Sequence, residues 1–251
     1  DGDGISGRLQ RIPGPTGSRV GRFGWKAAQP DLESQIARAF HEDMGVTSRR
    51  YPEANCPTGD EACLLQEGQE IELTDSDLHL VALYARLLAP PARRDWQDPA
   101  VLRGRDLFVS TGCSDCHRTE LETAAVERAA ENPSEARERS TPPPQPEILP
   151  ELAGQTIRPF TDLLLHDMGP ELADGIVEHS ASASEWRTAP LWGLGLLERV
   201  NGHLRLLHDG RARTVEEAIL WHGGEGAASR EAYTQLPDDR RAALLQFLRS
   251  L

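Results

Sequence analysis

The chain has 251 residues, of which 38% are apolar, and it contains 22 glycines and 18 prolines. This length allows one large or two small domains with many loops. The 40 acidic and 27 basic residues give a formal net charge of −13, which disfavours nucleic acid and anionic membrane surfaces as partners. No run of 18 apolar residues occurs, so we expect no membrane span.

The first residues, Asp1-Gly2-Asp3-Gly4, include neither a Met nor an apolar signal segment. We therefore expect that an upstream segment has been removed. Calcium prefers oxygen ligands, and Asp side chains separated by Gly suit it. A calcium loop with Asp1 and Asp3 as ligands is one interpretation of this stretch, and a solvated turn is the other.

A first helix is predicted between Pro30 and Gly45. Proline suits the first turn of a helix, and glycine suits the position after the last turn. Apolar residues recur at every fourth position between them, namely Leu32, Ile36, Phe40 and Met44. The loop that follows, over residues 46–70, carries Cys56 and Cys63. A disulfide between these two would pin a turn and would suit an oxidising compartment outside the cytoplasm; two free thiols are the alternative.

A second helix is predicted after Thr74-Asp75-Ser76-Asp77, a stretch that offers several N-cap side chains. Pro90-Pro91 stops this helix. Its apolar residues form a helical stripe, which comprises Leu80, Val81, Tyr84, Leu87 and Leu88.

A second unit is predicted over residues 97–251. Asp98 and Pro99 suit the N-cap and the first turn of a helix over residues 100–110. Thr111-Gly112 ends this helix, and Cys113-Ser114-Asp115-Cys116-His117 follows at once. C-x-x-C-H is the signature of covalent c-type haem attachment, in which two thiols bind the haem vinyl groups. His117 then lies under the porphyrin and can bind the iron from the proximal side.

Two other interpretations of this motif are weaker. A zinc site needs two further ligands at short spacing, whereas six residues separate Cys56 from Cys63. A thioredoxin-like dithiol needs a βαβ context, which the flanking sequence does not show.

The remaining chain predicts a charged insertion, a loop region and two helices. Residues 119–150 are rich in Glu, Arg, Ala and Pro and read as a solvated insertion, and residues 154–212 are dominated by loops, which suit a domain wrapped around a cofactor. Thr214 and Glu217 form a capping box before a helix that places Val215, Ala218, Ile219 and His222 on one face. Pro237-Asp238-Asp239 begins a terminal helix, which we expect to pack across the helix before the haem motif.

The sixth iron ligand has two candidates on residue grounds. Met168 lies 51 residues after His117 and is one of two methionines. His222 lies at the end of an apolar helical face, where a histidine is more often part of the core. An open sixth position would allow peroxide to bind, whereas a second strong ligand favours electron transfer.

The stretch from residue 98 to residue 251 resembles the C-terminal haem domain of bacterial di-haem cytochrome c peroxidases. The whole chain is most similar to a branch called di-haem oxidoreductases or thiol oxidoreductase-like proteins. The matching segments are Gly112–His117, Phe160–Asp162, His166–Gly169, Arg187–Trp192, Leu207–Arg211 and Thr214–Ile219, with Gly21–Lys26 and Leu220–Gly224 typical of the branch.

The resemblance implies a set of site residues. The peroxidases place a Met ligand eight residues after the Thr of the capping box, and this chain has His222 there, so bis-His ligation by His117 and His222 becomes the leading assignment. His208 and Arg211 would lie near the haem propionates. Pro190 would pack beside the proximal histidine. Trp25 would be an interhaem relay, and the family's calcium site between two haem domains supports the interpretation of Asp1 and Asp3.

The resemblance also predicts the fold and function. The expected fold is mostly α with long loops: a class I cytochrome c-like haem domain over residues 97–251, preceded by a smaller helical and loop region over residues 1–96. The family has two haems, and this chain has one CxxCH motif. It therefore looks like the C-terminal portion of a longer protein whose N-terminal haem handles peroxide.

We accordingly predict a periplasmic or otherwise extracytoplasmic electron-transfer module with one covalent haem c. Its expected partners are an upstream haem domain, in the same protein or in a partner chain, and a small redox protein that donates electrons. The alternatives are a stand-alone mono-haem electron carrier with Met168 as sixth ligand, and a non-catalytic haem-containing interaction domain.

Overall fold

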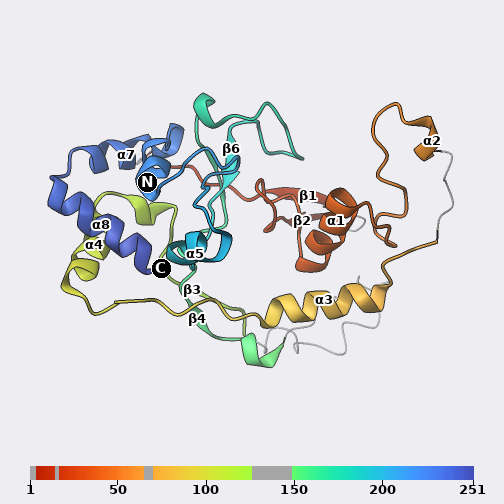
Figure 1. Cartoon of the computed structure of the whole chain (residues 1–251), viewed down its shortest axis with the longest axis horizontal. Coiled ribbons are helices and arrows are strands. Elements are labelled where there is room, and N and C mark those ends of the chain that lie inside the picture. The colour runs from red at the N-terminus through yellow and green to blue at the C-terminus, as the bar shows by residue number, and fades with distance from the viewer. Residues whose placement is uncertain (1–3, 15–16, 65–69, 126–148) are drawn as a thin grey trace.

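The computed structural model describes residues 4–14, 17–64, 70–125 and 149–251, and helices outweigh strands in them (Figure 1). The helices are α1 (Leu32–Met44), α2 (Glu61–Leu64), α3 (Asp75–Leu87), α4 (Pro99–Ser110), α5 (Leu197–Asn201), α6 (Val215–Leu220), α7 (Ala227–Thr234) and α8 (Asp238–Ser250). The strands are β1 (Arg11–Gly14), β2 (Gly17–Val20), β3 (Leu121–Glu122), β4 (Thr156–Ile157), β5 (Leu165–Asp167) and β6 (Glu185–Arg187). They pair antiparallel as β1–β2, β3–β4 and β5–β6. The predicted character, mostly α with long loops, is confirmed.

The main core forms where α4 and α8 cross (Figure 1). A Cβ at Gly104 would lie 2.1 Å from the carbonyl oxygen of Ala243, so only glycine permits this approach. Three aromatic rings meet beside the crossing: Phe108 lies 5.3 Å from Phe247 and 6.0 Å from Phe160 between ring centroids. The predicted packing of the terminal helix across the helix before the CxxCH motif is therefore confirmed.

Helix α4 ends directly before the CxxCH motif. The Asp98 carboxylate accepts a hydrogen bond from the Ala100 amide at 2.7 Å, as expected for an N-cap, and Pro99 occupies the first turn. At the other end, Gly112 takes φ +81°, a left-handed value that favours glycine. The chain therefore turns sharply out of the helix and into the motif.

The first predicted helix begins later than expected. Its N-cap is Asp31, whose carboxylate accepts a hydrogen bond from the Ser34 amide at 2.7 Å, so Pro30 lies outside the helix. The helix begins after Asp31 rather than at Pro30 because the Asp31 carboxylate satisfies an otherwise unpaired amide of the first turn. Gly45 ends the helix in a left-handed conformation, as predicted.

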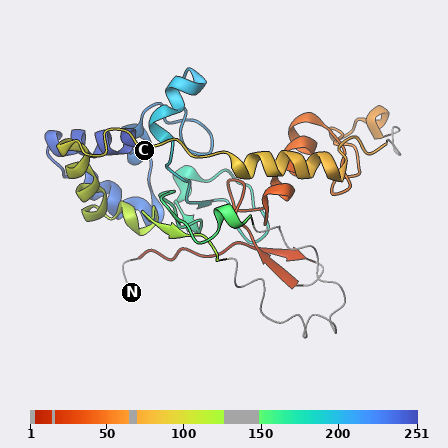
Figure 2. The same ribbon diagram turned by 90° about the horizontal axis from the view of Figure 1, so that it is seen from below.

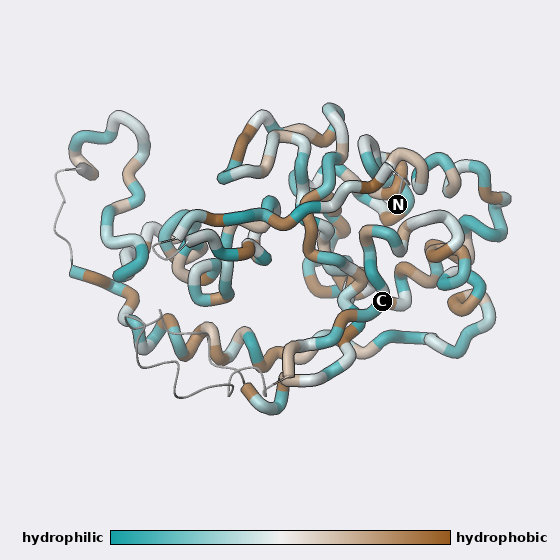
Figure 3. The backbone as a smooth tube through the Cα atoms, turned by 180° about the vertical axis from the view of Figure 1, so that it is seen from behind, coloured by the Kyte–Doolittle hydropathy of each residue, from teal (hydrophilic) through white to brown (hydrophobic). Residues whose placement is uncertain are grey.

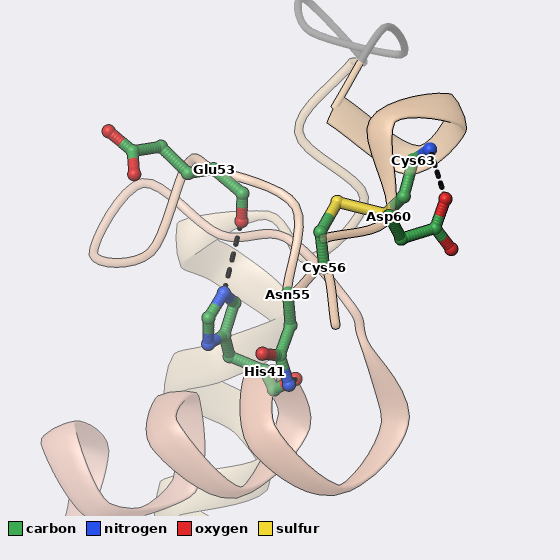
Figure 4. Close-up of a disulfide and its surroundings, with 6 residues drawn as sticks. All are labelled: His41, Glu53, Asn55, Cys56, Asp60 and Cys63. Carbon is green, nitrogen blue, oxygen red and sulfur yellow. Dashed lines mark hydrogen bonds between the residues drawn. A yellow bond between two sulfur atoms is a disulfide. The ribbon is translucent and has the colours of Figure 1, made fainter. Parts of the chain in front are cut away.

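The predicted disulfide between Cys56 and Cys63 is present (Figure 4). It closes the loop after α1, and the Asp60 carboxylate accepts a hydrogen bond from the Cys63 amide inside this loop. The loop is tied back to α1, because the His41 ring bonds the Glu53 carbonyl and the Asn55 amide donates to the His41 carbonyl. The bridge therefore pins a turn rather than joining distant parts of the chain.

Helix α3 forms as predicted, with Thr74 as its N-cap, but its apolar stripe faces outward. The buried side of α3 consists of Leu78 and Ala82, and Leu78 packs with Ala37 of α1. The hydropathy colouring shows apolar residues along this helix (Figure 3). The stripe residues are 36–67% exposed, and they are Leu80, Val81, Tyr84, Leu87 and Leu88. From α3 an extended segment leads to α4 (Figure 2).

The capping box before α6 forms in part. Thr214 accepts a hydrogen bond from the Glu217 amide at 3.0 Å, but the Glu217 carboxylate accepts from the Arg213 amide rather than from Thr214. The helix ends at Leu220, so His222 lies beyond it and not on its face as predicted. Glycines follow at once and do not favour a further helical turn.

The region over residues 154–212 is dominated by loops, as predicted. Most of the predicted insertion, residues 126–148, lies outside the described residues, but the chain on either side of it is joined by the β3–β4 pair. Helices α5 and α7 were not predicted. Among the described residues, no helix combines the length and apolarity that a membrane crossing requires.

We predict that Gly104→Ala destabilises the fold by about 2 kcal/mol, because the added methyl group meets backbone that cannot yield without separating α4 from α8. Chemical denaturation followed by circular dichroism measures the change. Arg103→Ala, an exposed substitution on the same helix, is the control. Equal stability of the two variants would show that the crossing tolerates a side chain.

Candidate haem site

The two cysteines of the CxxCH motif lie at a 3-10 turn, η1 (Cys113–Asp115), directly after α4. Both thiols are free and half-buried. Burial raises the pKa of Cys113, and the hydroxyl of Thr111, 3.3 Å from its sulfur, only partly opposes this shift. Cys113 is therefore a protonated thiol rather than an activated thiolate, which disfavours the redox dithiol interpretation.

The zinc interpretation also loses support. Cys56 and Cys63 are bonded to each other and cannot complete a site with the motif. In the part of the chain that the structure describes, no group of three or more His, Cys, Asp or Glu side chains is placed to hold a metal ion. Haem iron needs fewer protein ligands than zinc, because the porphyrin supplies the equatorial ligands and the chain supplies only the axial ones.

His117 is oriented by a backbone carbonyl. Its Nδ1 lies 2.8 Å from the carbonyl oxygen of Phe160. A carbonyl can only accept, so Nδ1 carries the proton and Nε2 keeps its lone pair. Burial lowers the pKa of His117 to about 4, and the Phe160 hydrogen bond only partly opposes this shift. The ring is therefore neutral at physiological pH, which is the form that binds iron.

The His222 ring is oriented in the same way as the His117 ring. Its Nδ1 lies 2.8 Å from the carbonyl oxygen of Ala218, in the last turn of α6, so its Nε2 also keeps a lone pair. Burial lowers its pKa. The two histidines are close enough that a charge on His222 lowers the pKa of His117. The structure thus brings together two neutral imidazoles that are 105 residues apart in the sequence.

Met168 lies beside His222. A Cβ built on Gly226 would be 3.3 Å from the Met168 Cε and 3.3 Å from the His222 Cδ2. Both predicted candidates for the sixth ligand therefore occupy the same side of the site. The His222 side chain is the more restrained of the two candidates. Its ring is fixed by the Ala218 carbonyl, whereas a methionine side chain has several freely rotating bonds.

A tight backbone contact brings these two segments together. A Cβ at Gly224 would lie 2.1 Å from the carbonyl oxygen of Asp167, and a Cβ at Gly223 would lie 2.8 Å from that of Met168. Gly224 also takes φ +49°. Glycine is thus required at the point where the loop after α6 meets β5.

A charged cluster that the sequence did not predict lies next to Cys116. His166, 3.6 Å from the Cys116 sulfur, has its Nδ1 2.7 Å from Glu225 and its Nε2 2.9 Å from Asp162. Burial would lower the pKa of His166, but these hydrogen bonds outweigh burial and raise it to about 11. His166 is therefore an imidazolium between two carboxylates. Glu225 is 59 residues from His166, and no local pattern links them.

The other residues predicted for the haem site are His208, Arg211, Pro190 and Trp25, and each has its own surroundings. His208 stacks on Trp186 with 3.6 Å between ring centroids, and the Lys26 ammonium lies 3.9 Å from the same ring. Arg211 lies over Trp221 at 4.7 Å and pairs with Asp209. Pro190 is half-buried, and two hydrogen bonds tie its segment to the segment of Phe160: the Thr161 hydroxyl donates to the Thr188 carbonyl, and the Leu191 amide donates to the Pro159 carbonyl. Trp25 is 56% exposed.

The predicted calcium ligands, Asp1 and Asp3, lie outside the described residues. The calcium site therefore stays a prediction.

The family described as "Di-haem oxidoreductase, putative peroxidase" matches residues 10–251. The chain belongs to this family. Membership in the di-haem oxidoreductases confirms the predicted resemblance and gives the protein a haem-related redox role.

Among solved structures, one to which the chain is similar is a chain of Kuenenia stuttgartiensis hydrazine synthase, pressurised with 20 bar of xenon, which is 18% identical with a TM-score of 0.39. The match covers 70% of this chain and 55% of that chain, so this chain spans little more than half of that chain's length. No curated protein matches the chain significantly.

We predict that the stabilisation from His166 depends on pH. A folded-state pKa of about 11 exceeds the unfolded value of about 6.5, so the stabilisation is full below about pH 6.5 and is lost as the pH rises towards 11. His166→Gln should cost about 3 kcal/mol at pH 6 and less at pH 10, as measured by chemical denaturation. The exposed His203→Gln is the control. A pH-independent cost would contradict the charged pairing.

Proposed function

We propose that the chain is the c-type haem electron-transfer module of an extracytoplasmic di-haem oxidoreductase. The observation that carries the proposal is the pair formed by His117 and His222. Both rings are neutral, both hold Nδ1 on a backbone carbonyl, and both keep the Nε2 lone pair for a metal. Beside them, Cys113 and Cys116 are free to bind the haem vinyl groups.

The local fold supports this assignment. Helix α4 leads directly into the motif, and α8 crosses α4, which is the arrangement expected of a cytochrome c-like domain. The aromatic rings of Phe108, Phe160 and Phe247 pack together, and the Phe108 ring lies 6.4 Å from the His117 ring between centroids, so they would shield the proximal ligand of a bound haem from water. Phe160, one of these three aromatic residues, also supplies the backbone carbonyl that orients His117. The proximal ligand is therefore held by the core.

Two protein ligands favour electron transfer over substrate binding. A bound haem would supply one-electron chemistry between ferric and ferrous iron. With His117 and His222 both in place, no position is left for peroxide, and the fixed rings minimise rearrangement when the electron moves. Two imidazoles should also give a lower reduction potential than an imidazole with a methionine, because Met ligation raises the potential.

The partners follow from the family and the charge. The family is di-haem, and the chain holds one CxxCH motif, so the second, peroxidatic haem is proposed to lie outside this chain. The net charge of −13 suits docking of a small redox protein with a basic face. The Cys56–Cys63 disulfide supports an extracytoplasmic location.

We predict one covalent haem per chain when the protein is matured in cells that attach c-type haem. Intact-mass measurement and a pyridine haemochrome assay give the stoichiometry. Replacing Cys113 and Cys116 by Ala should abolish covalent attachment, and the Cys56→Ser/Cys63→Ser variant should keep it. Covalent haem on the Cys113/Cys116 variant would contradict the assignment.

We predict that His222→Ala converts the ferric spectrum from low-spin to high-spin, because it removes a strong axial ligand. Absorption and electron paramagnetic resonance spectra measure the spin state. Met168→Leu and the exposed His203→Ala are the controls and should stay low-spin. A spectrum that changes with Met168→Leu and not with His222→Ala would instead support the mono-haem carrier with Met168 as ligand.

We predict that the haem-loaded chain alone does not reduce peroxide at an appreciable rate, whereas His222→Ala, with a free sixth position, gains activity. A steady-state assay with a small cytochrome as donor compares the two proteins. Turnover by the unaltered chain would contradict the electron-transfer role.

A further inference from the structure

His166 has no role in the proposed ligation, yet it is among the most constrained polar side chains in the structure. Its side chain is 3% exposed, and each ring nitrogen faces a carboxylate at hydrogen-bond distance. Carboxylates accept hydrogen bonds, so both nitrogens donate. Charge-assisted bonds of this kind are about twice as strong as neutral ones. A buried, doubly bonded imidazolium therefore lies beside the haem attachment motif.

One carboxylate belongs to the segment that supports His117, and the other belongs to the loop that carries His222. Asp162 lies two residues after Phe160, whose carbonyl holds His117. Glu225 lies three residues after His222. His166 thus connects the segment that supports His117 with the loop that carries His222.

The N-terminal segment, residues 6–8, closes over this bridge. The Ser6 amide donates to Glu225 at 3.0 Å and the Ser6 hydroxyl at 2.9 Å. A Cβ at Gly7 would lie 2.4 Å from the His166 Cε1, so the backbone lies directly on the ring. Arg8 and Leu165 exchange backbone hydrogen bonds of 3.0 and 2.9 Å, so the segment is also hydrogen-bonded to β5.

Besides its backbone contact with β5 at Gly224, the loop that carries His222 is held by the hydrogen bonds of its own side chains. It leaves α6 after Leu220 and contains glycines at 223, 224 and 226. Glycine-rich backbone gains much conformational freedom when released. Glu225 is the side chain of this loop that accepts hydrogen bonds both from His166 and from the N-terminal segment. Loss of the Glu225 bonds would therefore remove the main polar restraint on the loop.

We propose that Asp162, His166 and Glu225, together with the segment 6–8, form a clamp that holds His222 in its ligating position. Withdrawal of the segment frees the loop and opens the sixth position of the iron. His166 is then a positioning residue, and the N-terminal segment becomes the part through which an upstream domain can switch the haem between electron transfer and ligand binding. This inference rests on the proposed His117/His222 ligation.

The test uses the haem-loaded chain and cyanide as a probe of the sixth position. Glu225→Gln removes a charge from the clamp, and Gly7→Ala pushes the segment off the His166 ring without replacing a charged side chain. Each should raise the rate of cyanide binding to ferric haem about tenfold and increase the high-spin fraction. Glu231→Gln and Ser18→Ala, both at exposed positions, are the matched controls and should stay within about twofold of the wild type.

His222→Ala in the same assay separates the two proposals. If it binds cyanide rapidly while Glu225→Gln and Gly7→Ala both bind at the wild-type rate, the clamp is overturned and the ligation stands. If His222→Ala keeps the wild-type spectrum and rate, the ligation itself fails and the clamp with it. Circular dichroism melting shows that each variant is folded, so a change in rate reports the site rather than global unfolding.

Discussion

The contact between Gly104 and Ala243 is the constraint on which the site depends. Because it lets α4 and α8 approach at backbone distance, Phe108 and Phe247 meet Phe160. Phe160 in turn presents the carbonyl that fixes the tautomer and direction of the His117 ring. The close approach of Gly104 to Ala243 therefore affects, through Phe160, the direction of the Nε2 lone pair of His117. The placement of the His222 loop depends on a second backbone approach, that of Gly224 to Asp167.

Local sequence patterns predicted much of the helical framework. The N-caps at Asp98 and Thr214 were correct, and Thr74 is one of the several candidates that its stretch offered, because one side-chain oxygen and a nearby amide determine each cap. The disulfide was predictable because its cysteines are close in sequence. The start at Pro30 was wrong because a carboxylate cap at Asp31 competes with it, and periodicity could not show that the stripe of α3 faces outward, since periodicity identifies a face and not what covers it.

The site was predictable where its chemistry is contiguous, as in the CxxCH motif, and less so where distant segments meet. His166 and Glu225 come together through tertiary structure, and neither the charge of His166 nor its bridging position has a signature in the flanking residues. No pattern in the sequence of residues 6–8 indicates that Gly7 lies on the His166 ring. Glycines that permit contact between distant backbones resemble, in sequence, glycines that merely end helices.

If haem is attached as proposed, two of the four cysteines must be oxidised during maturation and the other two must stay reduced. Cys56 and Cys63 are oxidised to a disulfide, whereas Cys113 and Cys116 must stay reduced to form thioethers. The structure helps to sort them, because burial raises the pKa of the Cys113 thiol and thereby slows its thiol–disulfide exchange. Folding around α4 would thus protect Cys113 while the loop of Cys56 and Cys63 is oxidised. The order of folding, oxidation and haem attachment would then be part of the protein's biogenesis.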